Sequence, residues 1–241
     1  DAVLDCVFYC VHVTHGLEEE FVPLKTQHIA LLGGGLLVLV FVIATSLYND
    51  QREVEMGEAA SRPSSPLERD YAQTRGPADA KVVLVEFFDP ACETCRVFYG
   101  HVKILLAENP DKVRLVLRYA PFHHGADQMA LILEAARKQG KYWEALEVMY
   151  ETQPQWASHH RPQPEKIWAF LAAGGINVDT LRRDMKNPDL MAIVNQDIAD
   201  AKTLGVSKTP QFFVNGKPLM SFGYRPLKAM LDAEVAAQYG S

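Results

Sequence analysis

The sequence predicts an α/β domain that follows a single membrane-spanning helix. Three observations lead to this fold class. An uncharged run of 19 residues lies near the start of the chain, at residues 29–47. From residue 81 onward, short β-branched runs alternate with stretches of helical spacing, in the order strand, helix, strand, helical block, strand, strand, helix. The 241 residues, 48% of them apolar, suffice for one full domain with accessory segments.

The uncharged run is long enough to cross a bilayer. At about 1.5 Å per residue, a helix of this length approaches the roughly 30 Å thickness of the hydrocarbon layer. Lys25 and His28 precede the run, whereas Asp50 and Glu53 follow it. This charge bias predicts a cytoplasmic N-terminus and an exported main domain. We therefore expect a signal anchor at residues 25–48 in the inner membrane of a bacterium, with the main domain of this single-pass protein in the periplasm.

Residues 1–24 fit this plan poorly, because a bacterial signal anchor normally begins only a few residues before its apolar run. We interpret them as an N-terminal extension that an over-long gene prediction explains. Alternatively, Cys6 and Cys10, four residues apart, bind a metal or a partner. For the anchor, the alternative is a secretory signal cleaved near Ala44 and Ser46, although the apolar run is longer than such signals usually have. Either way the main domain is exported.

Residues 49–80 predict a flexible linker. They are rich in Glu, Arg, Ser, Pro and Ala, contain a Pro-Ser-Ser-Pro cluster and show no hydrophobic period. The net charge of −6 arises in the first third of the chain: residues 1–80 hold 5 basic and 12 acidic side chains, and residues 81–241 hold 19 and 18. A main domain with balanced charge gives no electrostatic reason to expect nucleic acid as a partner.

Each element of the main domain has a local signal. Residues 82–88 are β-branched and aromatic, as in a buried strand, and Asp89-Pro90 ends them. Residues 113–119 place Val113, Leu115 and Leu117 on one face and Arg114 and Arg118 on the other, which predicts a second strand. Asn215-Gly216 predicts a hairpin turn. The hairpin strands are expected at 211–214 and 217–221, and helices at 92–109, 128–139, 142–152, 164–173, 179–186, 189–204 and 226–238.

Cys92 and Cys95 carry the clearest chemical signal in the chain. They form a C-x-x-C pair directly after a predicted strand and at the start of a predicted helix. At that position the Cys92 thiol faces unpaired backbone N–H groups and the positive end of the helix dipole, and both favour the thiolate. Cys95 lies one turn further into the helix and is better shielded. The sequence therefore predicts a redox pair in which Cys92 exchanges with substrate and Cys95 resolves the mixed disulfide.

Residues 81–238 resemble the thioredoxin superfamily, and within it the DsbA-like periplasmic thiol-disulfide oxidoreductases. Three features carry the resemblance: Glu86-Phe87-Phe88 ahead of Cys92-Glu93-Thr94-Cys95, a helical insertion at about 121–205, and Val206-Ser207-Lys208-Thr209-Pro210 leading into the hairpin. The resemblance implies a thioredoxin fold over residues 81–241 with no cofactor or metal. It implies as partners the thiols or disulfides of exported proteins and a membrane redox protein for recycling.

The resemblance also implies roles for single residues. Pro210 matches the family's cis-proline, which lies beside the nucleophile and leaves the backbone of Thr209 free to pair with extended substrate. Glu86 matches a buried acid that takes the proton of the resolving thiol; a surface carboxylate is the alternative. The dipeptide between the cysteines departs from the Pro-His of DsbA, and the charge of Glu93 predicts a less oxidising couple. Whether the protein donates, removes or shuffles disulfides stays open.

A metal-binding module on the same fold is the alternative function. Cys92 and Cys95 would bind copper, zinc or mercury together with His123. Adjacent histidines cannot easily share one tetrahedral site, so we interpret the pairs at 123–124 and 159–160 as solvated loop residues. A non-catalytic chaperone or scaffold is a third interpretation. Turnover of dithiol substrates by Cys92 without a metal would exclude the metal-binding module.

Overall fold

The computed structural model describes residues 26–61, 66–157 and 162–240, with side chains from residue 34 onward. The predicted N-terminal extension and the histidines at 159 and 160 lie outside these residues. The chain divides into two compact units, Asp1–Leu47 and Tyr48–Ser241.

Helix α1 (Thr26–Ser61) contains the uncharged run. Within the described side chains, its segment Gly34–Ser61 is the one helix that is long and apolar enough to cross a membrane. Every side chain from residue 34 to residue 47 is exposed, as expected for a helix whose apolar surface is not covered by protein. The predicted helix at 29–47 is therefore confirmed, and it is a candidate membrane span by length and composition.

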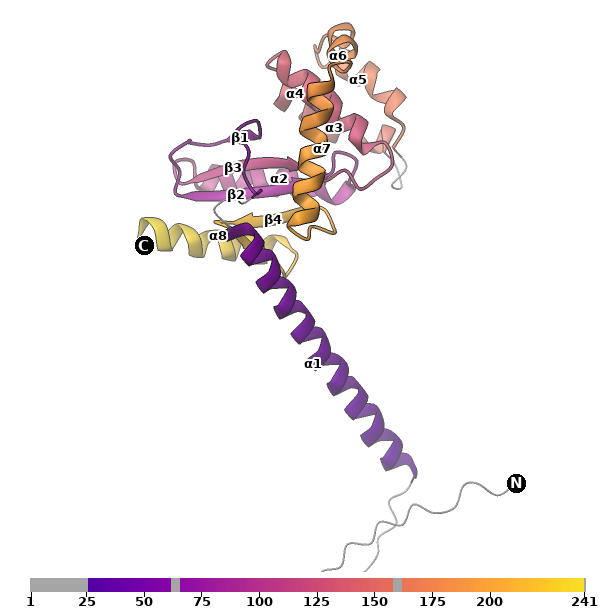
Figure 1. Cartoon of the computed structure of the whole chain (residues 1–241), viewed down its shortest axis with the longest axis vertical. Helices are drawn as coiled ribbons and strands as arrows, with labels where there is room; N and C mark the ends of the chain where they lie inside the picture. The colour runs from indigo at the N-terminus through magenta and orange to yellow at the C-terminus, as the bar shows by residue number, and fades with distance from the viewer. Residues whose placement is uncertain (1–25, 62–65, 158–161, 241) are drawn as a thin grey trace, which may run out of the picture. The chain divides into compact units, whose positions relative to one another are not determined.

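One mixed sheet of five strands forms the centre of the second unit (Figure 1). The parallel pair β2 and β3 lies in the middle, with β1 antiparallel to β3 and with β4 antiparallel to β2. The strand order is β1-β3-β2-β4-β5. The strands are β1 (Gln73–Arg75), β2 (Val82–Phe88), β3 (Val113–Tyr119), β4 (Gln211–Val214) and β5 (Lys217–Pro218).

Helices cover both faces of this sheet. Helix α2 (Glu93–Glu108) and helix α8 (Tyr224–Tyr239) share the larger hydrophobic core with one face. Helix α7 (Pro188–Thr203) and the end of α1 share a smaller core with the other face. Figure 1 shows the helices of the insertion gathered together, as the sequence predicts. They are α3 (Ala126–Lys138), α4 (Tyr142–Trp156), η2 (Pro164–Lys166), α5 (Ile167–Ala173), α6 (Val178–Asp184) and α7.

Strand β2 sends alternate side chains to the two faces of the sheet. Leu84 and Phe88 belong to the larger core under α2 and α8, whereas Val85 and Phe87 belong to the smaller one. Glu86 lies between Leu84 and Phe88 in this alternation. A carboxyl group is therefore placed on the apolar face that also carries α2.

Residues 49–80 differ in two stretches from the expected flexible linker. Helix α1 continues into them, and Met56, Ala59 and Ala60 on it are buried against the sheet. Residues 66–75 are also part of the domain and end in β1. The sequence hides both features, because the buried stripe consists mainly of small alanines among charged residues and because β1 depends on backbone pairing with β3.

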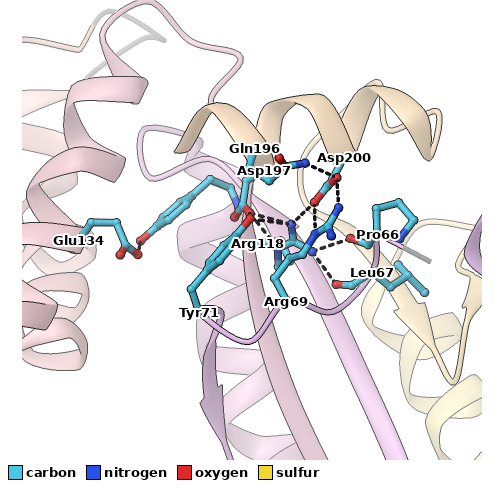
Figure 2. Close-up of polar contacts among 10 residues, drawn as sticks. Pro66, Leu67, Arg69, Tyr71, Arg118, Glu134, Gln196, Asp197 and Asp200 are labelled. Carbon is cyan, nitrogen blue, oxygen red and sulfur yellow. Dashed lines mark hydrogen bonds and ion pairs between the residues drawn. The ribbon is translucent and has the colours of Figure 1, made fainter. Parts of the chain in front are cut away.

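A buried arginine binds Pro66 and Leu67, the first residues of the stretch 66–75 (Figure 2). Arg118 of β3 is fully buried, and its guanidinium donates to the backbone oxygens of Pro66 and Leu67 at 2.5 and 2.8 Å. The same guanidinium forms ion pairs of 2.7 and 2.6 Å with Asp197 and Asp200 of α7. Arg118 thus joins three separate parts of the chain: the segment after α1, the sheet and the last helix of the insertion.

Two further side chains from this segment bind the same carboxylates. Arg69 makes a bidentate contact with Asp200, at 2.8 and 2.7 Å. The Tyr71 hydroxyl donates to Asp197 at 2.7 Å, and the backbone N–H of Tyr119 donates to the other Asp197 oxygen at 2.8 Å. The two buried carboxylates are therefore compensated by charge and by hydrogen bonds, as buried charges require.

Helix α4 extends beyond its predicted end at residue 152, although Pro154 lies inside it. Its last residue, Trp156, is buried, and the indole N–H donates to the backbone oxygen of Met149 at 2.9 Å. The last turn thus stays helical in spite of the proline, whose ring and missing N–H usually interrupt a helix, with Trp156 buried and bonded back to the same helix.

Candidate active site

Cys92 begins helix α2 directly after the turn that follows β2. It is the N-cap residue, with φ −74 and ψ 121, and its carbonyl oxygen accepts from the backbone N–H of Arg96 at 3.2 Å. Cys92 is 5% exposed, whereas Cys95, one turn further into the helix, is fully buried. Both are free thiols. The predicted placement of the pair, after a strand and at a helix start, is confirmed.

Thr209 and Pro210 face Cys92 from the chain entering β4. The Thr209-Pro210 peptide bond is cis, as the sequence predicts. The Cys92 Sγ lies 3.5 Å from the backbone oxygen of Thr209, which is 117 residues away in the sequence. The loop before the hairpin therefore lies against the nucleophile candidate.

Glu86 is buried in the middle of β2, with 3% of its surface exposed. It lies opposite Leu117 of β3 and Phe212 of β4 in the sheet register. Burial, with a smaller contribution from the charge of Cys92, raises the pKa of Glu86 to about 8. The expectation of a buried acid is correct, and the alternative of a surface carboxylate is wrong.

The two thiols have opposite protonation preferences. The pKa of Cys92 is lowered to about 5, first by the hydrogen bond from the Cys95 thiol, then by the backbone N–H of Cys95, the side chain of Thr209 and the backbone N–H of Thr94, which together outweigh burial. Burial raises the pKa of Cys95 well above its ordinary value. Near neutral pH the pair therefore holds a thiolate at Cys92 and a thiol at Cys95.

His123 contacts the active-site turn through Asp89. One Asp89 oxygen accepts from the backbone N–H of Ala91 at 2.7 Å. The other accepts from the backbone N–H of His123 at 2.8 Å and lies 2.7 Å from the ring Nδ1 of the same residue. In the alternative function predicted from the sequence, His123 is a metal ligand. In the part of the chain that the structure describes, no three His, Cys, Asp or Glu side chains are grouped so that they could hold a metal ion.

Gln153 of α4 also contacts this turn and is not among the site residues predicted from the sequence. Its side-chain amide bonds to Pro90, Cys92 and Arg96. A signal was present in the sequence, because Gln153 is a polar residue on the buried stripe of α4. The other members of that stripe are Tyr142, Ala145, Leu146, Met149, Tyr150 and Trp156.

Comparisons with known proteins agree with this geometry. The sequence model of the thioredoxin family matches residues 69–233. A thioredoxin-like oxidoreductase from Silicibacter pomeroyi DSS-3 is 28% identical, covers 75% of this chain and 99% of its own, and superposes with a TM-score of 0.62. BdbD from Bacillus subtilis, in its oxidised form, shares the fold at 23% identity, with 68% and 92% coverage and a TM-score of 0.60.

The curated relatives are named as ion antiporters, not as oxidoreductases. The Na(+)/H(+) antiporter NhaA of Herminiimonas arsenicoxydans is 32% identical over 169 residues, which is 70% of this chain but 26% of the antiporter. The chain thus spans about a quarter of the length of that relative. Because the match covers 70% of this chain, it must overlap more than half of residues 69–233, the part that fits the thioredoxin family.

Proposed function

Because the chain belongs to the thioredoxin family, we propose that it is a thiol-disulfide oxidoreductase in which Cys92 and Cys95 are the reacting pair. The observation that carries this proposal is the placement of the two thiols: Cys92 begins α2 beside the backbone of Thr209, and Cys95 lies one turn further in and is fully buried. The protonation preferences of the two thiols agree with this placement. A thiolate is the species that attacks a disulfide, whereas a buried thiol is held back until it is needed.

The reaction follows from the geometry. The Cys92 thiolate attacks one sulfur of a substrate disulfide, the substrate S–S bond breaks and one substrate thiolate leaves. The Cys95 thiol then gives its proton to the Glu86 carboxylate and attacks Cys92 Sγ. The second substrate thiolate leaves, so the substrate is reduced by two electrons and the pair becomes a disulfide. The same steps in reverse donate a disulfide to a dithiol substrate.

Glu86 suits the role of proton acceptor because its pKa responds to the state of Cys92. The negative charge of the Cys92 thiolate contributes to the raised pKa of Glu86. That charge disappears when Cys92 enters a mixed disulfide. Glu86 then ionises more readily, at the step in which Cys95 must lose its proton.

The loop before β4 supports substrate binding. Thr209 is partly exposed, and its backbone lies beside Cys92 Sγ. An extended substrate segment that places its sulfur against Cys92 would pair with the backbone of Thr209, and the missing N–H of Pro210 leaves that face uncluttered.

We place the domain on the outer side of the inner membrane of a bacterium, anchored by α1. The support is the candidate span in α1 and the charge bias around it. Exported proteins are the substrates that this location supplies, because disulfides form and persist outside the cytoplasm. A membrane redox protein would return the Cys92–Cys95 pair to its starting state.

The similarity to part of an antiporter favours a second candidate function. In this interpretation the domain acts on the thiols of an ion antiporter in the same membrane. The specific observation is the 32% identity over 70% of the chain. Sodium-proton exchange by membrane vesicles that contain both the protein and an antiporter distinguishes the two candidate functions. The rate of exchange would change with Cys92→Ala only if the domain acts on the antiporter.

Trapping of mixed disulfides tests the main proposal. With Cys95→Ala, mixed disulfides between Cys92 and substrate should accumulate, because the resolving thiol is missing. With Cys92→Ala, almost nothing should be trapped. Non-reducing electrophoresis and mass spectrometry of the trapped species measure both results, and addition of a metal chelator should leave them unchanged. Equal trapping by both variants would refute the assignment, and loss of trapping with the chelator would favour the metal-binding module.

A further inference from the structure

Both polar atoms of the Gln153 side chain form hydrogen bonds to the start of α2 and the turn before it. It is 1% exposed, on helix α4 of the insertion. Its amide nitrogen donates to the backbone oxygen of Pro90 at 3.0 Å and to that of Cys92 at 3.1 Å. Its amide oxygen accepts from the Arg96 Nε at 3.0 Å. A side-chain amide has two N–H donors, and here each has an acceptor.

Packing alone gives no reason for an amide at this position. The neighbouring members of the buried stripe, Leu146 and Met149, are apolar and fully buried. A buried polar group is tolerated only when its hydrogen bonds are satisfied, and a satisfied buried group fixes the geometry of its partners. Two of the three partners of Gln153 are backbone oxygens of the active-site turn, and the third is the side chain of Arg96 in α2.

These two backbone oxygens control where α2 begins. The Cys92 oxygen also accepts the first helical hydrogen bond, from the backbone N–H of Arg96 at 3.2 Å. Pro90 lies two residues earlier in the same turn. With both oxygens held from α4, the extended conformation of Cys92 at φ −74 and ψ 121 is held as well. The first turn of α2 then keeps a fixed direction relative to Cys92 Sγ.

We propose that Gln153 is a positioning residue for thiol-disulfide exchange, which holds the turn from Pro90 to Cys92 so that the backbone N–H groups of Thr94 and Cys95 face Cys92 Sγ. This inference rests on the proposed function of the cysteine pair. It gives the helical insertion a part in the chemistry, because α4 reaches across to the thioredoxin-like half of the domain.

A second residue of α4 interacts electrostatically with the active site. Tyr150 lies three positions before Gln153 and is buried. Burial, followed by the charges of Cys95, Glu86 and Asp89, raises the pKa of Tyr150.

The consequence is a dependence of the thiolate on a residue 61 positions away. Backbone N–H groups stabilise the thiolate form of Cys92 only while they point at it. Release of the turn would weaken these bonds, raise the pKa of the Cys92 thiol and remove part of the stabilisation of the reduced state. The Cys92–Cys95 couple would become more reducing.

Gln153→Met tests this inference in the full-length protein, because methionine keeps the length of the side chain and removes its hydrogen bonds. The pKa of the Cys92 thiol, followed by pH-dependent alkylation, should rise by about one unit, which is a roughly tenfold loss of thiolate stabilisation. In the equilibrium with glutathione, the Cys92–Cys95 couple should shift toward its disulfide form. A tenfold shift of this equilibrium corresponds to about 30 mV.

Leu146→Ala is the matched control, since Leu146 is buried on the same helix and the mutation leaves the turn untouched. It should lower thermal stability and leave the pKa of Cys92 unchanged. Gln153→Glu is the second variant if Gln153→Met does not fold: it keeps an acceptor for Arg96, loses the donors and should raise the pKa at least as much.

Two outcomes overturn the inference. One is an unchanged pKa of Cys92 in the folded Gln153 variants, and the other is an equal shift in Leu146→Ala. A wild-type protein that exchanges no disulfides would refute the proposed function itself. If the wild-type protein exchanges disulfides and the pKa of Cys92 is the same in Gln153→Met, only the positioning role is refuted.

Discussion

Cys92 and Cys95 share one helix turn, yet their surroundings differ in the number of hydrogen-bond donors. Cys92 at the helix start receives the Cys95 thiol and the backbone N–H groups of the first turn, so that its thiolate is stabilised. Cys95 is fully buried and has burial as the dominant influence on its pKa. The same short motif thus produces an anion at Cys92 and a neutral thiol at Cys95, because the two residues differ in position on the helix.

The first prediction concerns the reactivity of Cys92. Only the thiolate reacts with an alkylating reagent, so the alkylation rate of reduced protein should rise with pH around a midpoint of about 5. Mass spectrometry of the peptide that contains Cys92 measures the rate. Cys95→Ala removes the largest stabilising hydrogen bond, and its midpoint should lie higher. A wild-type midpoint near the ordinary value of roughly 8.5 would contradict the prediction.

The second prediction concerns Glu86 and the stability of reduced protein. Its pKa rises from 4.5 to about 8 on folding, so the folded state binds the proton more tightly. The resulting stability is fully present below pH 4.5 and is lost as the pH rises toward 8. Glu86→Gln cannot lose a proton. Its free energy of unfolding relative to wild type should therefore increase by about 1 kcal/mol per pH unit across this window.

Urea unfolding of both reduced proteins at several pH values measures this difference. The same variant should exchange disulfides more slowly, because Cys95 loses its proton acceptor, while the first attack by Cys92 continues. A stability difference that stays constant between pH 4.5 and pH 8 would show that Glu86 is ionised throughout.

At the scale of elements, strand β3 carries two arginines with different fates. Arg114 and Arg118 point to the same face of the sheet, since they are four residues apart on one strand. Arg114 pairs with the half-exposed Glu68 at 2.7 Å. Arg118 is fully buried between the carboxylates of Asp197 and Asp200. A sequence pattern cannot separate the two, because the difference lies in what α7 and the segment after α1 place against each position.

Substitution of these two arginines by leucine gives a matched pair of variants. Arg118→Leu leaves two buried carboxylates without their main partner and should cost about 3 to 5 kcal/mol of unfolding free energy. Arg114→Leu removes a partly exposed pair and should cost no more than about 1 kcal/mol. Urea unfolding measures both. Similar losses in the two variants would mean that the network around Arg118 contributes little to stability.

Local patterns predicted most of the elements and much of the candidate site. The strands β2 and β3, the hairpin at Asn215-Gly216 and the C-x-x-C helix start were all expected, because turn chemistry and hydrophobic period act over a few residues. Glu86, Thr209 and Pro210 came from a resemblance to a family. The contacts of Gln153 were not expected, because they join elements that are distant in the sequence. The same is true of β1, an edge strand defined only by its pairing with β3.

At the scale of the whole molecule, the main domain begins earlier than its sequence suggests. The thioredoxin family match starts at residue 69, and the hydrogen bonds of Arg118 reach back to Pro66. The residues from there to β1 supply an edge strand and partners for three buried charges, which are Arg118, Asp197 and Asp200. They are part of the fold of the domain, and this changes how a soluble fragment should be chosen.

The last prediction compares two soluble fragments, residues 48–241 and residues 80–241. The longer fragment is the compact second unit. The shorter one begins beyond the segment that binds Arg118, so two carbonyl acceptors, the Arg69–Asp200 pair and the Tyr71–Asp197 hydrogen bond are lost. It also leaves the edge of β3 unpaired, and an uncovered edge strand promotes association between molecules. The shorter fragment should be less stable by at least about 3 kcal/mol, because it lacks two hydrogen bonds to the charged Arg118, each of which contributes roughly 1.5 to 3 kcal/mol. Urea unfolding and light scattering measure stability and association. Equal stability of two monomeric fragments would show that residues 66–75 lie on the domain without supporting it.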